Sequence, residues 1–139
     1  MRFVDASVFV HAYLKPRRHL SDAESGIKES ARRIVTRVNS GEEVMTTVVH
    51  LAEVANILED YMPLGEALAV EEALLFKDTI VVAPISREDY HAALQEAKDE
   101  QIGLTDALAF ASMKESGLSE IYSFDKDFDR IAHVKRISE

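Results

Sequence analysis

Short apolar stretches rich in β-branched residues alternate along this chain with longer segments of helical periodicity. The clearest stretch covers residues 79–83, a nearly continuous β-branched run of the kind expected for a strand buried on both faces. Strands that alternate with helices favour a mainly parallel sheet, which helices cover on both faces through right-handed crossovers. The pattern therefore predicts an α/β fold whose ligands bind beyond the carboxyl ends of the strands.

Five strands and six helices are expected from the hydrophobic pattern. The predicted strands are residues 3–4, 43–46, 79–83, 120–123 and 134–137. The predicted helices are residues 6–14, 27–40, a segment from Thr46 or Thr47 up to Pro63, then 65–76, 87–100 and 105–116. Either threonine is a suitable cap for the helix that follows it. Residues 15–26 contain a proline, a glycine and many polar residues, which favour a loop.

The composition indicates one globular domain that does not span a membrane. The chain has 139 residues, enough to bury a core, and 47% of them are hydrophobic. No apolar stretch approaches the roughly 20 residues that a membrane span requires. Asp5 comes too early for a secretory signal peptide, so we expect a cytoplasmic protein. The absence of cysteine excludes disulfides, thiolate metal sites and a cysteine nucleophile.

The formal net charge of −9 argues against broad adhesion to nucleic acid through a basic face. It does not exclude a nuclease, because a divalent cation held by carboxylates reverses the sign of the local field. The densest basic cluster is Lys15, Arg17, Arg18 and His19, in the loop after the first predicted helix. This cluster is either an ordinary solvated loop or a phosphate clamp beside Asp5.

Four acids stand where a predicted strand ends or an apolar helix begins. Asp5 and Asp125 follow the first and fourth strands, Asp106 opens an apolar helix, and Glu53 borders the apolar face of another. Buried acids cost free energy unless they are hydrogen-bonded or tied to a cation. Because parallel strands end at one edge of their sheet, the four acids predict a site for a hard metal ion and chemistry on a phosphate.

Position is the basis of this prediction, since the chain contains 25 acids. All four also have ordinary structural interpretations. Asp5 is a favoured residue type for capping the next helix. Asp106 in a first helical turn complements the helix dipole, and Glu53 is compatible with a simple boundary position.

Three acids alternate after the fourth predicted strand. Asp125 lies nearest the strand end and is predicted to point inward, whereas Asp129 is left to solvent. The pattern leaves the direction of Asp127 open. A solvated turn with one capping aspartate is the alternative interpretation.

These motifs, in this order, resemble the PIN-domain family, most closely the VapC-type toxin ribonucleases of prokaryotic toxin–antitoxin pairs. The matching segments are residues 4–8 (Val-Asp-Ala-Ser-Val), 52–54 (Ala-Glu-Val), 104–107 (Leu-Thr-Asp-Ala) and 123–128 (Ser-Phe-Asp-Lys-Asp-Phe). They span nearly the whole chain, so residues 1–139 are interpreted as a single PIN-like domain. The resemblance implies a three-layer α/β/α sandwich with a mainly parallel sheet of about five strands.

The resemblance also implies a site that binds Mg²⁺ or Mn²⁺ and hydrolyses RNA phosphodiester bonds. Its acidic quartet corresponds to Asp5, Glu53, Asp106 and Asp125. Secondary polar positions are Ser7, Ser123 and Asp127, and Lys15, Arg17 and Arg18 are candidates for substrate binding. Ser123 stands where the family often has threonine, a departure that keeps a hydroxyl.

Phosphodiester hydrolysis needs a nucleophilic water and a stabilised anionic phosphorus centre, and a divalent ion supplies both. We expect Asp5, Asp106 and Asp125 to hold this ion, and Glu53 to orient the water or to help hold a second ion. Without metal the acids repel one another, so at least one pKa should rise. The five histidines show no paired metal-ligand spacing and are expected to be structural or solvent-facing.

Two other functions compete with the ribonuclease. A receiver-like phosphoacceptor domain needs an aspartate at the end of its third strand, where this chain has Ala83 and Pro84. A catalytically silent PIN-fold interaction module would be marked by loss of the acids, all of which are present. The resemblance further implies an RNA substrate, an antitoxin partner and a homodimer, and the apolar helices in residues 47–76 offer surface for such contacts.

Overall fold

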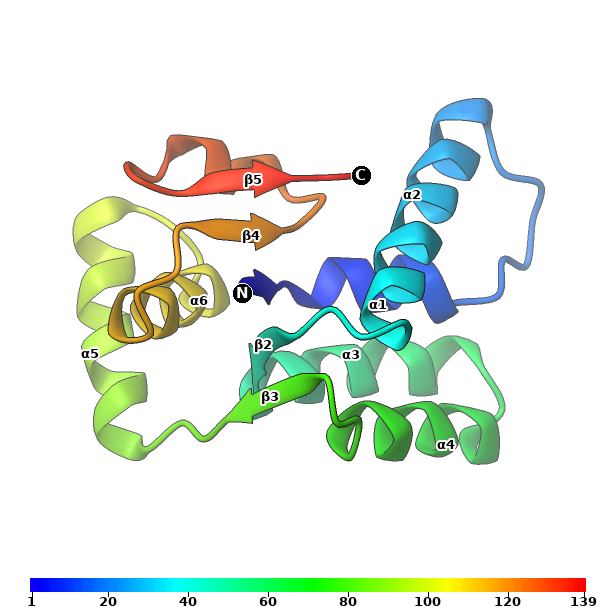
Figure 1. The fold of residues 1–139 in the computed structure, drawn as a ribbon, viewed down its shortest axis with the longest axis horizontal. Helices are drawn as coiled ribbons and strands as arrows, with labels where there is room; N and C mark the ends of the chain where they lie inside the picture. The colour runs from blue at the N-terminus through cyan, green and yellow to red at the C-terminus, as the bar shows by residue number, and fades with distance from the viewer.

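A computed structural model that describes residues 1–139 confirms the predicted α/β architecture (Figure 1). The strands are β1 (Arg2–Val4), β2 (Val44–Thr47), β3 (Ile80–Ala83), β4 (Glu120–Tyr122) and β5 (Lys135–Ile137). The helices are α1 (Ala6–Tyr13), α2 (Asp22–Asn39), α3 (Val48–Tyr61), α4 (Leu64–Leu75), α5 (Arg87–Glu100) and α6 (Leu104–Glu115). A short 3₁₀ helix, η1 (Lys126–Arg130), precedes β5. None of the helices combines the length and the apolar character that crossing a membrane would require.

The five strands form one parallel sheet in the order β3-β2-β1-β4-β5. The strand order reverses between β1 and β4, and such a switch point is where open α/β sheets bind ligands. The same order excludes a receiver-like phosphoacceptor domain, because the strands of that fold follow the order 2-1-3-4-5.

Alternation of side chains along the strands produces the two outer layers. Phe3 of β1 packs with Ile121 of β4 and Met113 of α6, on one face of the sheet. Val4 and Tyr122, the next residues of the same strands, belong to the larger cluster formed with α1, α2, α3 and α4. Figure 1 shows the result, with α5 and α6 on one side of the sheet and the first four helices on the other.

The predicted loop at residues 15–26 is too long, because α2 already begins at Asp22. The Ser21 hydroxyl accepts a hydrogen bond from the Glu24 N–H, and the Glu24 carboxylate accepts one from the Ser21 N–H. This capping box starts the helix four residues before Gly26. A glycine inside a helix costs only about 1 kcal/mol relative to alanine, so Gly26 does not stop it. The other predicted helices and strands agree within the usual end fraying.

Thr47, one of the two predicted candidates, caps α3. Its hydroxyl accepts a hydrogen bond from the His50 N–H at 3.2 Å and lies 2.7 Å from Nδ1 of the same histidine. Both residues are fully buried. The neighbouring Thr46 hydroxyl instead donates to the carbonyl oxygen of Val4 at 3.0 Å, which ties β2 to β1. The cap therefore fixes where α3 begins relative to the carboxyl edge of the sheet.

Replacing Thr47 with alanine should lower the free energy of unfolding by about 1–3 kcal/mol, because α3 loses its cap and a buried imidazole loses its partner. Thr47→Ser keeps the hydroxyl and should lose much less. Urea denaturation of the two variants measures the difference. Equal losses would show that the hydroxyl does not matter at this position.

Candidate active site

The acids predicted from the sequence gather at the carboxyl edge of the sheet, beside the switch point between β1 and β4. Asp5 follows β1, and Asp125 follows β4 after two intervening residues. Asp106 stands in the first turn of α6 and Glu53 in the second turn of α3. The other three carboxylates all act electrostatically on Asp106, so residues far apart in sequence share one site.

The carboxylate of Asp5 is oriented by two serine hydroxyls. Its Oδ2 accepts hydrogen bonds from the Ser7 hydroxyl at 2.9 Å and from the Ser123 hydroxyl at 2.8 Å, while Oδ1 accepts none. Asp5 occupies the N-cap position of α1, yet its side chain makes no capping hydrogen bond. The interpretation of Asp5 as a simple helix cap is therefore wrong.

The two serines also join the loop after β4 to the start of α1. The Ser123 hydroxyl accepts a hydrogen bond from the Asp125 N–H at 3.0 Å, and the Ser7 hydroxyl accepts one from the Phe124 N–H at 3.1 Å. Arg136 of β5 donates to the Ser123 carbonyl oxygen at 3.2 Å. These bonds hold the chain immediately before Asp125 at a fixed place beside Asp5.

Asp127 belongs to the tightest group of acids. Asp106, Asp125 and Asp127 each offer a carboxylate oxygen, and these oxygens all lie within 4.8 Å of one another. Asp125 is half-buried, and its Oδ1 accepts a hydrogen bond from the Asp127 N–H at 2.9 Å, which caps η1. Asp129 points away to Arg136, with oxygen–nitrogen distances of 2.9 and 3.1 Å. The sequence pattern leaves the direction of Asp127 open, and the 3₁₀ turn brings it to the site.

Burial and mutual repulsion raise the pKa of two of these acids. Burial is the largest cause for Asp106, followed by the charges of Asp125, Asp5, Asp127 and Glu53, and its pKa rises to about 7. Burial also raises the pKa of Glu53, with further contributions from Asp5 and Asp125. The expectation that at least one pKa rises is thus met, and burial is the largest single cause in both acids.

The residues of this site fit a hard divalent cation. Oε2 of Glu53 is buried without any hydrogen-bond partner, and the Asp106 carboxylate accepts no hydrogen bond. An unpartnered buried acid is costly unless a cation compensates its charge. All the available donor atoms are carboxylate oxygens, which suit Mg²⁺ or Mn²⁺ better than softer metals. Asp106, Asp125 and Asp127 are the residues placed to share one such ion.

His50 lies in the core close to Asp5, a position that no pattern in the sequence predicts. Its ring meets Phe3 edge-on at 5.0 Å between centroids, and its Nδ1 faces the Thr47 hydroxyl. Burial lowers the pKa of His50, and the charge of Asp5 opposes this shift in part. The prediction that the histidines are structural or solvent-facing holds for His50, which is a core residue beneath the site.

The predicted basic cluster is engaged elsewhere. Lys15 pairs with Glu66 at 3.1 Å, and the guanidinium of Arg18 pairs with Glu24 at 2.5 Å. Arg17 lies over the ring of Tyr61 at 5.6 Å from its centroid. None of the three contacts the acids, and their role as a phosphate clamp stays a prediction.

Comparison with known proteins points to one family. The family model for the PIN domain matches residues 2–134. Among solved structures, the chain is similar to VapC20 of Mycobacterium tuberculosis, a toxin that cleaves the sarcin–ricin loop, with 23% identity, a TM-score of 0.72 and 93% of each chain covered. It is also similar to a toxin–antitoxin complex from Klebsiella pneumoniae, with 17% identity, a TM-score of 0.65, and 97% of this chain and 96% of that chain covered. A search of curated protein sequences gave no significant match.

In metal-free protein, Asp106→Asn should raise the melting temperature most at pH 8, less near pH 5, and very little below about pH 4. The pKa of Asp106 is raised to about 7, so the folded state binds more protons than the unfolded state between roughly pH 4 and pH 7. The stability contributed by this group therefore falls as the pH rises through that window. We expect a gain of about 1–2 kcal/mol for the variant at pH 8, measured by thermal unfolding in EDTA.

Asp129→Asn is the matched control, since the hydrogen bonds from Arg136 lower the pKa of Asp129. Its stabilising effect is present at neutral pH and is lost in acid, so this variant should be less stable than wild type at pH 8. If both variants changed the stability at pH 8 in the same direction, the assignment of Asp106 as a destabilising buried acid would be contradicted.

Proposed function

We propose that this chain, which belongs to the PIN domain family, is a divalent-metal-dependent endoribonuclease and the toxin of a toxin–antitoxin pair. The observation that carries this proposal is the group of carboxylate oxygens from Asp106, Asp125 and Asp127 within 4.8 Å, beside a buried and unpartnered oxygen of Glu53. The similarity to a toxin that cleaves the sarcin–ricin loop supports RNA as the substrate class.

The metal ligands in this proposal include Asp127, in addition to the acids that the sequence predicts. Asp106, Asp125 and Asp127 would hold one Mg²⁺ or Mn²⁺ ion. When bound, such an ion lowers the pKa of its water and neutralises charge on the phosphoryl oxygens. Asp5 keeps one oxygen free of hydrogen bonds beside this group, because both serine hydroxyls bond to the other. Asp5 thus remains available as a further ligand in a fixed orientation.

Glu53 is the residue suited to take up a proton. Its carboxylate is half-buried and has a raised pKa, caused first by burial and then by Asp5 and Asp125. A base works best when its pKa lies near the working pH, so this shift favours proton transfer from an attacking water. Its Oε2 has no competing donor within the protein.

Partners and location follow from the same proposal. The similarity to a toxin–antitoxin complex supports a protein antitoxin as partner, and a homodimer is proposed on the family resemblance. The protein would meet its RNA substrate and its antitoxin in the cytoplasm. A catalytically silent PIN-fold interaction module is the second candidate. Such a module would bind no cation, so nothing would offset the free-energy cost of holding the partly buried carboxylates of Asp106 and Glu53 near each other.

Asp5→Asn and Asp106→Asn should each lower RNA cleavage by about 10²-fold or more, because electrostatic groups in such sites commonly contribute that much. Cleavage is measured on structured and single-stranded RNA, with Mg²⁺, Mn²⁺ or EDTA. The control is Asp60→Asn, an exposed acid on the same helix as Glu53 that makes no ion pair. It should cleave like wild type. Cleavage that persists in EDTA and in both site variants would rule out the mechanism.

Mg²⁺ or Mn²⁺ should raise the melting temperature of wild type more than that of Asp106→Asn, because a ligand that binds only the folded state stabilises it. The metal-induced shift should also shrink as the pH falls below about 7, where Asp106 takes up a proton. Thermal unfolding at pH 6 and pH 8, with and without metal, measures both effects. Equal shifts in the two proteins would remove Asp106 from the ligand set.

A further inference from the structure

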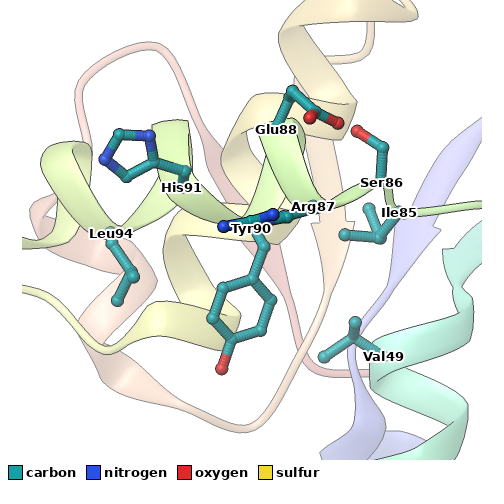
Figure 2. Close-up of a pocket in the computed structure, with 8 residues that line it drawn as sticks. All are labelled: Val49, Ile85, Ser86, Arg87, Glu88, Tyr90, His91 and Leu94. Atoms are coloured by element: carbon teal, nitrogen blue, oxygen red, sulfur yellow. The ribbon is translucent and has the colours of Figure 1, made fainter.

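A hollow of about 520 Å³ opens between the start of α5 and the start of α3 (Figure 2). Figure 2 shows the ring of Tyr90 projecting from α5 into the space between Val49 and Leu94. The side chains of Tyr90 and Leu94 are 42% and 37% exposed, so two large apolar surfaces are left without a partner inside the protein. The function proposed above assigns no role to this hollow.

The hollow lies next to the acids. Val49 lines it and stands four residues before Glu53 on α3, so their Cβ atoms are about 5–6 Å apart on one helix face. Val49 also packs in the small apolar cluster of Leu104 and Ala107, which flank Asp106 on α6. A ligand in the hollow would therefore be a close neighbour of anything bound at the acidic group.

Arg87 places an unpaired positive charge at the hollow. Its guanidinium lines the space and makes no hydrogen bond or ion pair within the protein. Two basic side chains elsewhere are engaged, Arg130 with Asp127 at 3.6 Å and Lys114 over the ring of Phe110 at 4.4 Å. Glu88 also lines the hollow, and its negative charge formally balances the positive charge of Arg87. The neighbouring site, in contrast, is built from acids.

We propose that this hollow receives one unpaired base of the RNA substrate, stacked on Tyr90, while Arg87 contacts an adjacent phosphate. The inference rests on the proposed ribonuclease function and adds a substrate subsite to it. A base presents a flat apolar face and a neighbouring anion, which match an aromatic ring beside a free guanidinium. A base held in this way must leave its stack, so single-stranded or looped RNA is the substrate form that fits.

The lining of the hollow favours this occupant over a protein segment. With a net charge of −9, the protein repels a polyanion overall, so affinity for RNA needs uncharged contacts such as stacking. The groove between α3 and α4 offers a contrast, because seven of its eight lining residues are hydrophobic and none is basic. That groove has the character expected for protein packing, whereas the hollow at Tyr90 combines an aromatic ring with a cation.

The test measures binding of fluorescent single-stranded oligoribonucleotides in EDTA, which separates binding from cleavage. Tyr90→Leu should weaken binding about tenfold, and Tyr90→Phe should bind like wild type, since stacking needs the ring and not the hydroxyl. Arg87→Gln should also weaken binding and lower the slope of log Kd against log salt by about 0.7. The controls are Phe76→Leu, an aromatic that is 73% exposed at the end of α4, and Lys98→Gln, an exposed cation of α5. Both controls should bind like wild type.

An abasic scan locates the base. Removing one base at a time should weaken wild-type binding at one position near the cut, and the same change should have no effect in Tyr90→Leu. Unchanged affinity in both Tyr90→Leu and Arg87→Gln, with cleavage intact in wild type, would overturn the subsite alone. Loss of self-association in Tyr90→Leu, with RNA binding unchanged, would instead make the hollow a protein interface. Absence of any RNA binding or cleavage in wild type would remove the proposed function and this inference with it.

Discussion

Carboxylate groups that repel one another are held within a few ångströms at one edge of a parallel sheet, and much of the molecule serves to keep them there. The chain meets this constraint with hydrogen bonds around the acids and with firm anchoring of the elements that carry them. Two serine hydroxyls fix Asp5, and a capped helix places Glu53. The remaining cost appears in the pKa of Asp106, which burial and its neighbours raise to about 7. A divalent cation is the simplest group that would relieve this repulsion.

The layered fold could be predicted because it depends on local patterns. Phe3 and Val4 alternate between the two faces, and β-branched runs separate helices of regular periodicity. The predicted start of α2 is wrong, because the proline, glycine and polar residues of segment 15–26 favour a loop whereas the capping box at Ser21 starts the helix. Local signals conflicted there, and the reciprocal hydrogen bonds decided the outcome.

The site was predictable only in part, because its details depend on contacts between distant segments. The acids Asp5, Asp106 and Asp125 follow from their places at strand and helix ends. The direction of Asp127 depends on the 3₁₀ turn, which Asp125 caps, and the pairing of Asp129 depends on Arg136 in β5. No spacing in the sequence reveals such a pairing in advance. The position of His50 beneath the acids was hidden for the same reason.

The hydrogen bond between Ser123 and Asp5 joins residues that stand 118 positions apart, and this separation has a consequence for synthesis. A growing chain carries Asp5 first, whereas the hydroxyl that orients it is added 118 residues later. If the proposed function holds, a chain that still lacks Ser123 has no fully oriented site. The message being translated would then be safe from its own product until this segment has been made and folded.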